Sequence, residues 1–296
     1  MNEKKISLES AFQKAINFLS RGDTTEAKSV FEKILEVKPD HILSLANLGI
    51  IFVQLKKHDQ AIKLFEKTIE INPKYAEGYN NLGNIFFELS EFDQALNYYN
   101  KAIKISPHFS DAFNNLGNIY SKKENFEKAI ENYESAILYN NAESNKDKPY
   151  FNLGNIHREL ENFEKSIDYY KKTIDLNPNA IDAYINLSIS LNKNGNLEEA
   201  INCCKTVLEK DPKNIKAINN LGKYNQEIGN EDLAISYYNK AIKLDPTNLL
   251  SKWNLMNTFP IIYRNSDQVN NFKKHFEKNL TIIENFIDKN NTLKND

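Results

Sequence analysis

Asparagine recurs at one slot of a repeating sequence, each time directly before a leucine. The seven positions are Asn47, Asn81, Asn115, Asn152, Asn186, Asn220 and Asn254. A primary amide carries a carbonyl acceptor and NH2 donors, so one side chain can pair with both the C=O and the N–H of a peptide backbone. A row of such amides is therefore suited to holding extended polypeptide of varied sequence. We call this row the asparagine ladder.

Three further asparagines follow the ladder slot by three residues, at Asn84, Asn118 and Asn155. On an α-helix with 100° per residue, the ladder slot lies opposite the apolar stripe of its own segment. We therefore expect the ladder on an exposed face rather than at a packing position, with the three further amides beside it. These ten asparagines are the predicted peptide-binding residues.

The abundance of asparagine supplies a competing explanation. The chain contains 44 asparagines, and lysine outnumbers arginine by 35 to 3, as a biased coding sequence would produce. Solvated surface asparagines inherited by duplication would also form a column. Other exposed slots have drifted, however, because Leu43, Glu77 and Asp111 share the slot four residues before the ladder. The two explanations remain open at this stage.

The ladder belongs to a regular repeat, since Asn47, Asn81 and Asn115 are 34 residues apart. Glycine follows Asn-Leu in five units, and glycine inside a helix costs about 1 kcal/mol relative to alanine, so close packing must compensate. An aromatic or soft apolar column follows at Phe31, Phe65, Tyr99, Tyr133, Tyr170, Cys204 and Tyr238. Prolines such as Pro73 and Pro107 end each unit. Each unit is therefore predicted to be an antiparallel pair of helices.

The period and columns resemble the tetratricopeptide repeat over about residues 8–248. The resemblance implies an all-α fold, a right-handed superhelical solenoid of about seven helix-turn-helix repeats. In such a superhelix the first helix of each pair lines a concave groove. The ladder would then run along that groove.

The predicted organisation has four parts. Residues 1–7 form an N-terminal tail, and residues 8–248 form seven repeats, with a three-residue insertion within 140–149 that is either a longer turn or a hinge. Residues 249–290 form a degenerate repeat, in which Met256 takes the glycine slot, and a capping helix that begins at Asp267. Residues 291–296 are a disordered tail. The apolar positions of the capping helix are Val269, Phe272, Phe276, Leu280, Ile283 and Ile287. Capping of the last repeat is the favoured interpretation, and a partner-binding or membrane-surface helix is the alternative.

A narrower resemblance concerns the units that read Tyr79-Asn80-Asn81-Leu82-Gly83-Asn84. They look like the substrate-recruiting superhelix of O-linked N-acetylglucosamine transferases, in which asparagines at this slot hold substrate backbone. The segment after Trp253 is similar to the one that joins repeats to catalytic lobes in bacterial relatives. No nucleotide-sugar lobes follow before Asp296, so no catalytic residue is carried over. The sequence predicts two alternative functions. The first is a binding scaffold, and the second is the recruiting arm of a glycosyltransferase whose catalytic part is missing or on another chain.

Composition argues against other classes. The net charge of −2 and pI of 6.3 provide no basic field for nucleic acid or anionic lipid. No apolar run suits a membrane span, and we expect a cytoplasmic protein whose partner is protein or extended peptide. Arg158 is the one candidate for a carboxylate clamp, and RNA recognition is disfavoured by the period. We predict no enzyme, cofactor or metal: the five histidines are dispersed, and Cys203 and Cys204 fit buried thiols.

Overall fold

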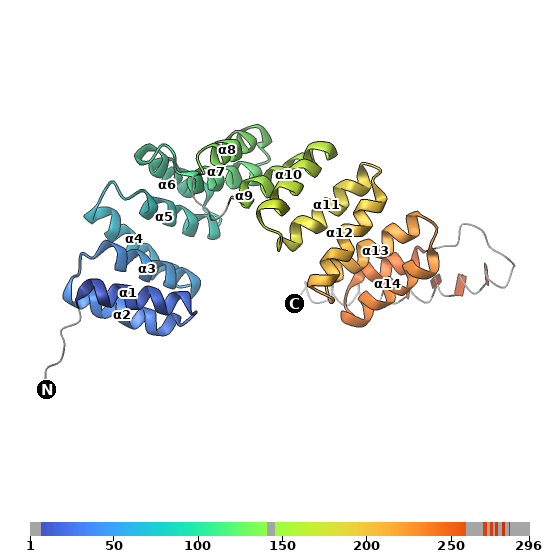
Figure 1. The fold of residues 1–296 in the computed structure, drawn as a ribbon, viewed down its shortest axis with the longest axis horizontal. Helices are drawn as coiled ribbons and strands as arrows, with labels where there is room; N and C mark the ends of the chain where they lie inside the picture. The colour runs from blue at the N-terminus through green and yellow to red at the C-terminus, as the bar shows by residue number, and fades with distance from the viewer. Residues whose placement is uncertain are drawn as a thin grey trace. The chain divides into compact units, whose positions relative to one another are not determined.

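The computed structural model describes residues 7–140 and 146–258, together with residues 269, 270, 273, 274, 276, 277, 280, 281 and 284. Within this part of the chain, fifteen α-helices and no strands are assigned (Figure 1). The odd-numbered helices are α1 (Leu8–Ser20), α3 (Ile42–Gln54), α5 (Ala76–Glu88), α7 (Ser110–Lys122), α9 (Asp147–Glu159), α11 (Ile181–Lys193), α13 (Ile215–Glu227) and α15 (Leu249–Met256). The even-numbered helices are α2 (Thr24–Val37), α4 (His58–Ile71), α6 (Phe92–Ile105), α8 (Phe126–Leu138), α10 (Phe163–Leu176), α12 (Leu197–Lys210) and α14 (Glu231–Leu244). The predicted all-α solenoid of paired helices is confirmed.

Glycine allows the two helices of a pair to pack closely. A Cβ added to Gly83 on α5 would lie 2.5 Å from Cε1 of the buried Tyr99 ring on α6. The same relation recurs for Gly49, Gly117, Gly154 and Gly222 with the aromatic residues of their own pairs. Where Ser188 replaces glycine, the facing column holds Cys204, a smaller side chain. The expected close packing is confirmed, and the exception is compensated within its own pair.

A residue in the left-handed conformation ends the first helix of each of the seven pairs. These residues are Gly22, Lys56, Ser90, Glu124, Glu161, Gly195 and Gly229. Only three of them are the glycine that this conformation favours. The turn between pairs is built differently. At Pro73, the preceding Asn72 is extended and its side-chain oxygen accepts a hydrogen bond from the backbone N–H of Lys74 at 3.0 Å. The proline slot therefore ends the second helix as predicted.

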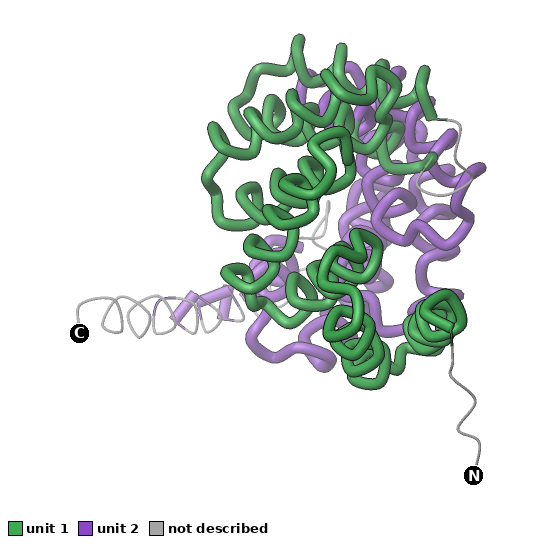
Figure 2. Tube along the Cα trace, turned by 90° about the vertical axis from the view of Figure 1, so that its left-hand side faces the viewer, with its two compact units in different colours: residues 1–152 green, residues 153–296 purple. Residues whose placement is uncertain are grey.

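The chain divides into two compact units, Met1–Asn152 and Leu153–Asp296, which Figure 2 colours separately. In unit 1, α3 packs on α5 and α5 packs on α7, and in unit 2 α11 packs on α13. Within each unit the odd-numbered helices therefore form one layer and the even-numbered helices another, as Figure 1 shows for unit 1 at α5–α8. The border between the units falls inside α9 rather than in the predicted insertion. Residues 141–145 lie outside the described residues, so the hinge stays a prediction.

The eighth unit is represented by α15, whose Met256 is buried in the glycine slot. Of the predicted capping helix, Asp267, Phe272, Ile283 and Ile287 lie outside the described residues. Val269 and Leu280 are helical and exposed, and Phe276 is helical and half-buried. Capping therefore stays a prediction. Residues 1–6 and 291–296 also lie outside the described part of the chain.

Candidate functional site: the asparagine ladder

All seven ladder asparagines lie on odd-numbered helices, and every one is half-buried. The side chains one turn before them are exposed, for example Glu77 before Asn81 on α5, whereas those one turn after, such as Asn84, are mostly half-buried. We call this surface, made of the ladder and the residues one turn to either side, the ladder face. The burial differs from the expectation that the ladder would avoid packing altogether.

Three ladder residues donate hydrogen bonds to the preceding odd-numbered helix. Nδ2 of Asn115 lies 2.9 Å from Oδ1 of Asn84 and 3.1 Å from Oδ1 of Asn80. In the same way, Nδ2 of Asn152 lies 3.1 Å from Oδ1 of both Asn118 and Asn114. Asn186 donates to Asn155 at 2.9 Å. These three ladder residues therefore lie partly between repeats, since each amide bonds to an amide of the preceding repeat. Helical periodicity within one unit does not reveal such a contact.

The accepting asparagines are held by buried tyrosines of their own helix pair. Tyr99 donates its hydroxyl proton to Oδ1 of Asn84 at 2.9 Å, Tyr133 to Asn118 at 2.9 Å and Tyr170 to Asn155 at 2.7 Å. Burial raises the pKa of the Tyr99 and Tyr170 hydroxyls above their ordinary value, so they remain donors. Each of these oxygens thus accepts one bond from its own pair and one from the next repeat.

Tyrosine and asparagine occur together in these two slots. Where Asn84, Asn118 and Asn155 occupy the accepting slot, the facing column holds Tyr99, Tyr133 and Tyr170. Where Ile16, Ile50 and Ile189 occupy it, the column holds Phe31, Phe65 and Cys204, which bring no phenol. A buried phenol needs an acceptor, and an aliphatic neighbour supplies none. The co-occurrence of the two residue types is present in the sequence, but the sequence alone does not show that the two slots are in hydrogen-bonding contact.

Ladder asparagines bond differently where the accepting slot of the preceding odd-numbered helix holds isoleucine. Asn47 turns its amide back to donate to the carbonyl of Leu43 at 2.8 Å, and Asn220 reaches Oγ of Ser188 at 3.5 Å. Asn81 makes no side-chain hydrogen bond to any residue in the described part of the chain, because Ile50 stands where its acceptor would be. The ladder is therefore regular in position and unequal in bonding.

One further amide occupies the ladder slot and was missed from the sequence. Gln13 on α1 stands at the position that Asn47 takes on α3, and it is exposed. Its Nε2 lies 3.4 Å from Oδ1 of Asn17. A search for amide chemistry at this slot, rather than for asparagine alone, would have found it.

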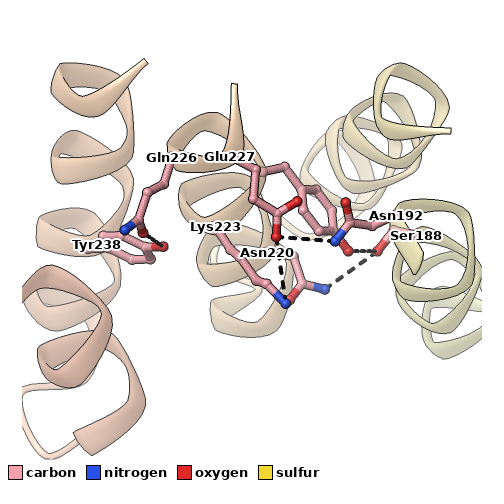
Figure 3. Close-up of polar contacts among 8 residues, drawn as sticks. Ser188, Asn192, Asn220, Lys223, Gln226, Glu227 and Tyr238 are labelled. Carbon is pink, nitrogen blue, oxygen red and sulfur yellow. Dashed lines mark hydrogen bonds and ion pairs between the residues drawn. The ribbon is translucent and has the colours of Figure 1, made fainter. Parts of the chain in front are cut away.

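In unit 2 the polar contacts shift to longer side chains, as Figure 3 shows. Lys223 replaces asparagine in the accepting slot of α13, and Tyr238 instead donates to Oε1 of Gln226 at 3.2 Å. Glu227 accepts from Asn192 at 3.4 Å and lies 3.9 Å from Nζ of Lys223 (Figure 3). The end of the array therefore keeps a polar ladder face with a different set of partners.

The groups that could act in catalysis are held as structural parts. Burial raises the pKa of the Cys203 thiol to about 11 and that of Cys204 to about 12, so neither is poised as a nucleophile. His157 is buried and stacked on Tyr169. Among the described residues, no group of three His, Cys, Asp or Glu side chains could hold a metal ion. No helix in the same part of the chain has the length and apolar character to cross a bilayer.

Stacked pairs of antiparallel helices, repeated along the chain, define the class of helical-repeat proteins. Models of the tetratricopeptide repeat match residues 8–41, 49–90, 76–109, 109–179, 157–222 and 215–248. The chain belongs to the tetratricopeptide repeat family.

Among solved structures, the chain is similar to YrrB, described as a tetratricopeptide repeat protein with an unusual peptide-binding site. The identity is 28%, the TM-score is 0.54, and the match covers 63% of this chain and 95% of YrrB. PilF of Pseudomonas aeruginosa matches at 20% identity and a TM-score of 0.65, over 72% of this chain and 95% of PilF. A chain of the Cut9–Hcn1 assembly matches at 15% identity and a TM-score of 0.68, over 86% of this chain and 50% of that chain. The last two likenesses concern the fold alone. No curated protein matches the chain.

Proposed function

We propose that this protein is a non-catalytic interaction scaffold whose ladder face binds extended polypeptide, in the concave groove expected of this fold. The observation that carries the proposal is which amide atoms are already hydrogen-bonded within the protein and which are not. Asn115 donates through Nδ2 to Asn84, while Oδ1 of Asn115 and Nδ2 of Asn84 make no hydrogen bond within the described residues. Each linked pair therefore offers one fixed acceptor and one fixed donor.

Fixed amides of this kind complement a peptide main chain. A backbone presents N–H and C=O groups in alternation, and an acceptor beside a donor can take one of each. The buried Tyr99 phenol and the inter-repeat bond hold the amides in place, so binding costs little side-chain entropy. Each bond contributes about 0.5–1.5 kcal/mol, while ordering a flexible segment costs about 2–5 kcal/mol. Affinity should be modest and shared among several repeats.

Asn81 is the most suitable residue with which to test the proposal, because its side chain makes no hydrogen bond to the described residues. The probe is a displayed library of random, unstructured peptides of about twelve residues, a length that spans four repeats at about three residues each. Captured peptides are then measured by fluorescence anisotropy. We expect Asn81→Ala to weaken binding about fivefold with unchanged helicity, since one main-chain contact worth about 1 kcal/mol is lost.

The matched control removes two exposed asparagines from the other layer, through the double change Asn97→Ala and Asn100→Ala on α6. It should leave capture unchanged. Asn115→Ala and Asn152→Ala should weaken capture further, but they also remove inter-repeat bonds, so their unfolding must be measured alongside. Peptide capture that is equal in the wild type and in Asn81→Ala, Asn115→Ala and Asn152→Ala would refute the proposal.

The recruiting-arm alternative uses the same face and is supported by the resemblance of units such as Tyr79–Asn84 to the glycosyltransferase superhelix. It differs from the scaffold proposal because it also requires a glycosyltransferase catalytic part, which would be missing here or on another chain. Captured proteins that become glycosylated when an O-linked N-acetylglucosamine transferase catalytic domain is fused to the chain, and not when Asn81 is replaced, would favour the alternative. Capture without such dependence favours the scaffold.

A further inference from the structure

The ladder face is interrupted at α3 by exposed aliphatic side chains. Leu43 and Ile50 lie one turn before and one turn after Asn47, and they are 49% and 41% exposed. Asn47 has turned its amide back to the carbonyl of Leu43, so its Nδ2 already donates within its own helix between these two side chains. The face of α3 is therefore largely aliphatic where α5 and α7 present amides.

The neighbouring helix offers an amide that bonds to none of the described residues. Asn81 on α5 follows the interruption, and Ile50 fills the slot that accepts from the ladder elsewhere. Helix α5 packs directly on α3. A free donor and acceptor thus lie beside an aliphatic surface, a combination that suits a main chain carrying an aliphatic side chain.

Carboxylates occupy the Leu43 slot on three other helices of this row, whereas Lys148 occupies it on α9. The carboxylates are Glu9 on α1, Glu77 on α5 and Asp111 on α7, all of them exposed. None makes an ion pair with a described residue. Elsewhere in unit 1, Glu88 pairs with Lys56 at 3.0 Å and Asp93 with Lys123 at 2.7 Å. A carboxylate in the first turn also favours its own helix, but that effect does not require it to stay unpaired.

The spacing of the helices sets the spacing of a bound chain. Neighbouring helices pack about 8–10 Å apart, and an extended peptide advances about 3.3 Å per residue. One repeat therefore corresponds to about three residues. Along α1, α3, α5 and α7 the ladder face presents a carboxylate, an aliphatic surface, and two more carboxylates.

We propose that unit 1 selects extended segments in which an aliphatic residue is followed and preceded, at three-residue spacing, by basic residues. In order the motif is basic, any two, aliphatic, any two, basic, any two, basic, in either chain direction. This specificity rests on the proposed binding function and adds the chemistry of the partner. Glu9, Glu77 and Asp111 take the basic side chains, Leu43 and Ile50 take the aliphatic one, and Asn81 takes the main chain beside it.

Unit 2 lacks the same arrangement. Its Leu43 slot holds Asp182, Lys216 and Leu250, and the charged atoms of Asp182 and Lys216 lie 3.6 Å apart, so the one carboxylate already has a cation. The selection for basic residues is therefore assigned to unit 1 alone.

The test uses the full chain and a fluorescein-labelled ten-residue peptide with lysine at the first, seventh and tenth positions, leucine at the fourth, and serine or glycine elsewhere. A second peptide of equal composition places the same residues at two-residue spacing. We expect the first to bind about fivefold more tightly, with an affinity that falls as salt rises. The double change Glu77→Gln and Asp111→Asn should remove most of that preference.

Two further variants separate the parts of the motif. Ile50→Asn gives Asn81 an acceptor, and together with Leu43→Ser it removes the aliphatic surface, so in the double variant the preference for leucine over serine at the fourth position should disappear. The controls are Glu66→Gln with Glu70→Gln for charge, and Ile71→Asn for an exposed aliphatic, all on α4, and they should change nothing. Equal binding of the two peptides, or full binding by the Glu77→Gln and Asp111→Asn double variant, would overturn this inference. Library peptides that still depend on Asn81 would then leave the scaffold proposal standing, whereas a lack of any peptide binding would overturn both.

Discussion

At the scale of single residues, the bond between Tyr99 and Asn84 can be exchanged for the apolar pair found in the preceding repeat. Asn84→Ile leaves the buried phenol without an acceptor, which we expect to cost about 1–3 kcal/mol. Tyr99→Phe alone should cost about 1 kcal/mol. The double variant reproduces Ile50 and Phe65 and should be more stable than the sum of the single losses predicts. Urea unfolding followed by circular dichroism measures all three, and strict additivity would contradict the pairing.

The same residues show how far the sequence alone could lead. The period placed Asn81 and Asn115 at one slot, and helical geometry placed that slot on the first helix of each pair. Neither predicted that Asn115 would bond to Asn84, because that contact joins residues 31 positions apart and depends on how one pair stacks on the next. Peptide binding by the ladder remains a prediction.

At the scale of helices, the contact between α9 and α10 contains a histidine in an aromatic stack. The ring centroids of His157 and Tyr169 lie 5.3 Å apart with the planes at 9°, and Nδ1 of His157 is buried without a hydrogen-bond partner among the described residues. Burial, with Lys165 nearby, lowers the pKa of His157 below its ordinary value, so the unfolded chain takes up this proton at a higher pH than the folded chain. The free energy of unfolding should therefore fall as pH drops through about 6.5 toward the folded-state pKa.

His157→Phe should remove this acid sensitivity, seen as a smaller difference in Tm between about pH 7.5 and about pH 5. The matched position is Phe86, which stacks on Tyr98 at 5.3 Å and 4° in the contact between α5 and α6. Phe86→His should introduce the sensitivity that His157→Phe removes. Identical pH profiles for the wild type and both variants would show that protonation in this stack has no effect on stability.

Helix ends were harder to predict than helices. Proline marked the ends of the even-numbered helices, since it cannot continue a helix. The ends of the odd-numbered helices were marked by glycine only in part, because Lys56, Ser90, Glu124 and Glu161 also adopt the left-handed conformation there. At these turns the packing of two helices imposes a backbone conformation that the local sequence does not favour.

At the scale of the whole chain, the repeat predicted one continuous array, whereas the contacts divide it into two units within α9. In the sequence, the feature nearest to this division is the three-residue insertion between α8 and α9. In a repeat protein, stability is close to a sum over repeats and their interfaces, so a unit with enough repeats should fold alone. At least about three repeats are needed, and residues 1–140 contain four helix pairs.

We therefore expect a fragment of residues 1–140 to remain helical and to unfold at a lower Tm than the full chain. The loss follows because Asn152 no longer donates to Asn114 and Asn118. If unit 1 carries the selectivity, this fragment should bind the lysine–leucine peptide within about twofold of the full chain, since its carboxylates and aliphatic surface are intact. A fragment of residues 146–296 should not bind it. Circular dichroism and anisotropy on the two fragments decide the matter: binding by the second fragment, or loss of binding by a folded first fragment, would mean that the selecting residues do not lie on α1–α7.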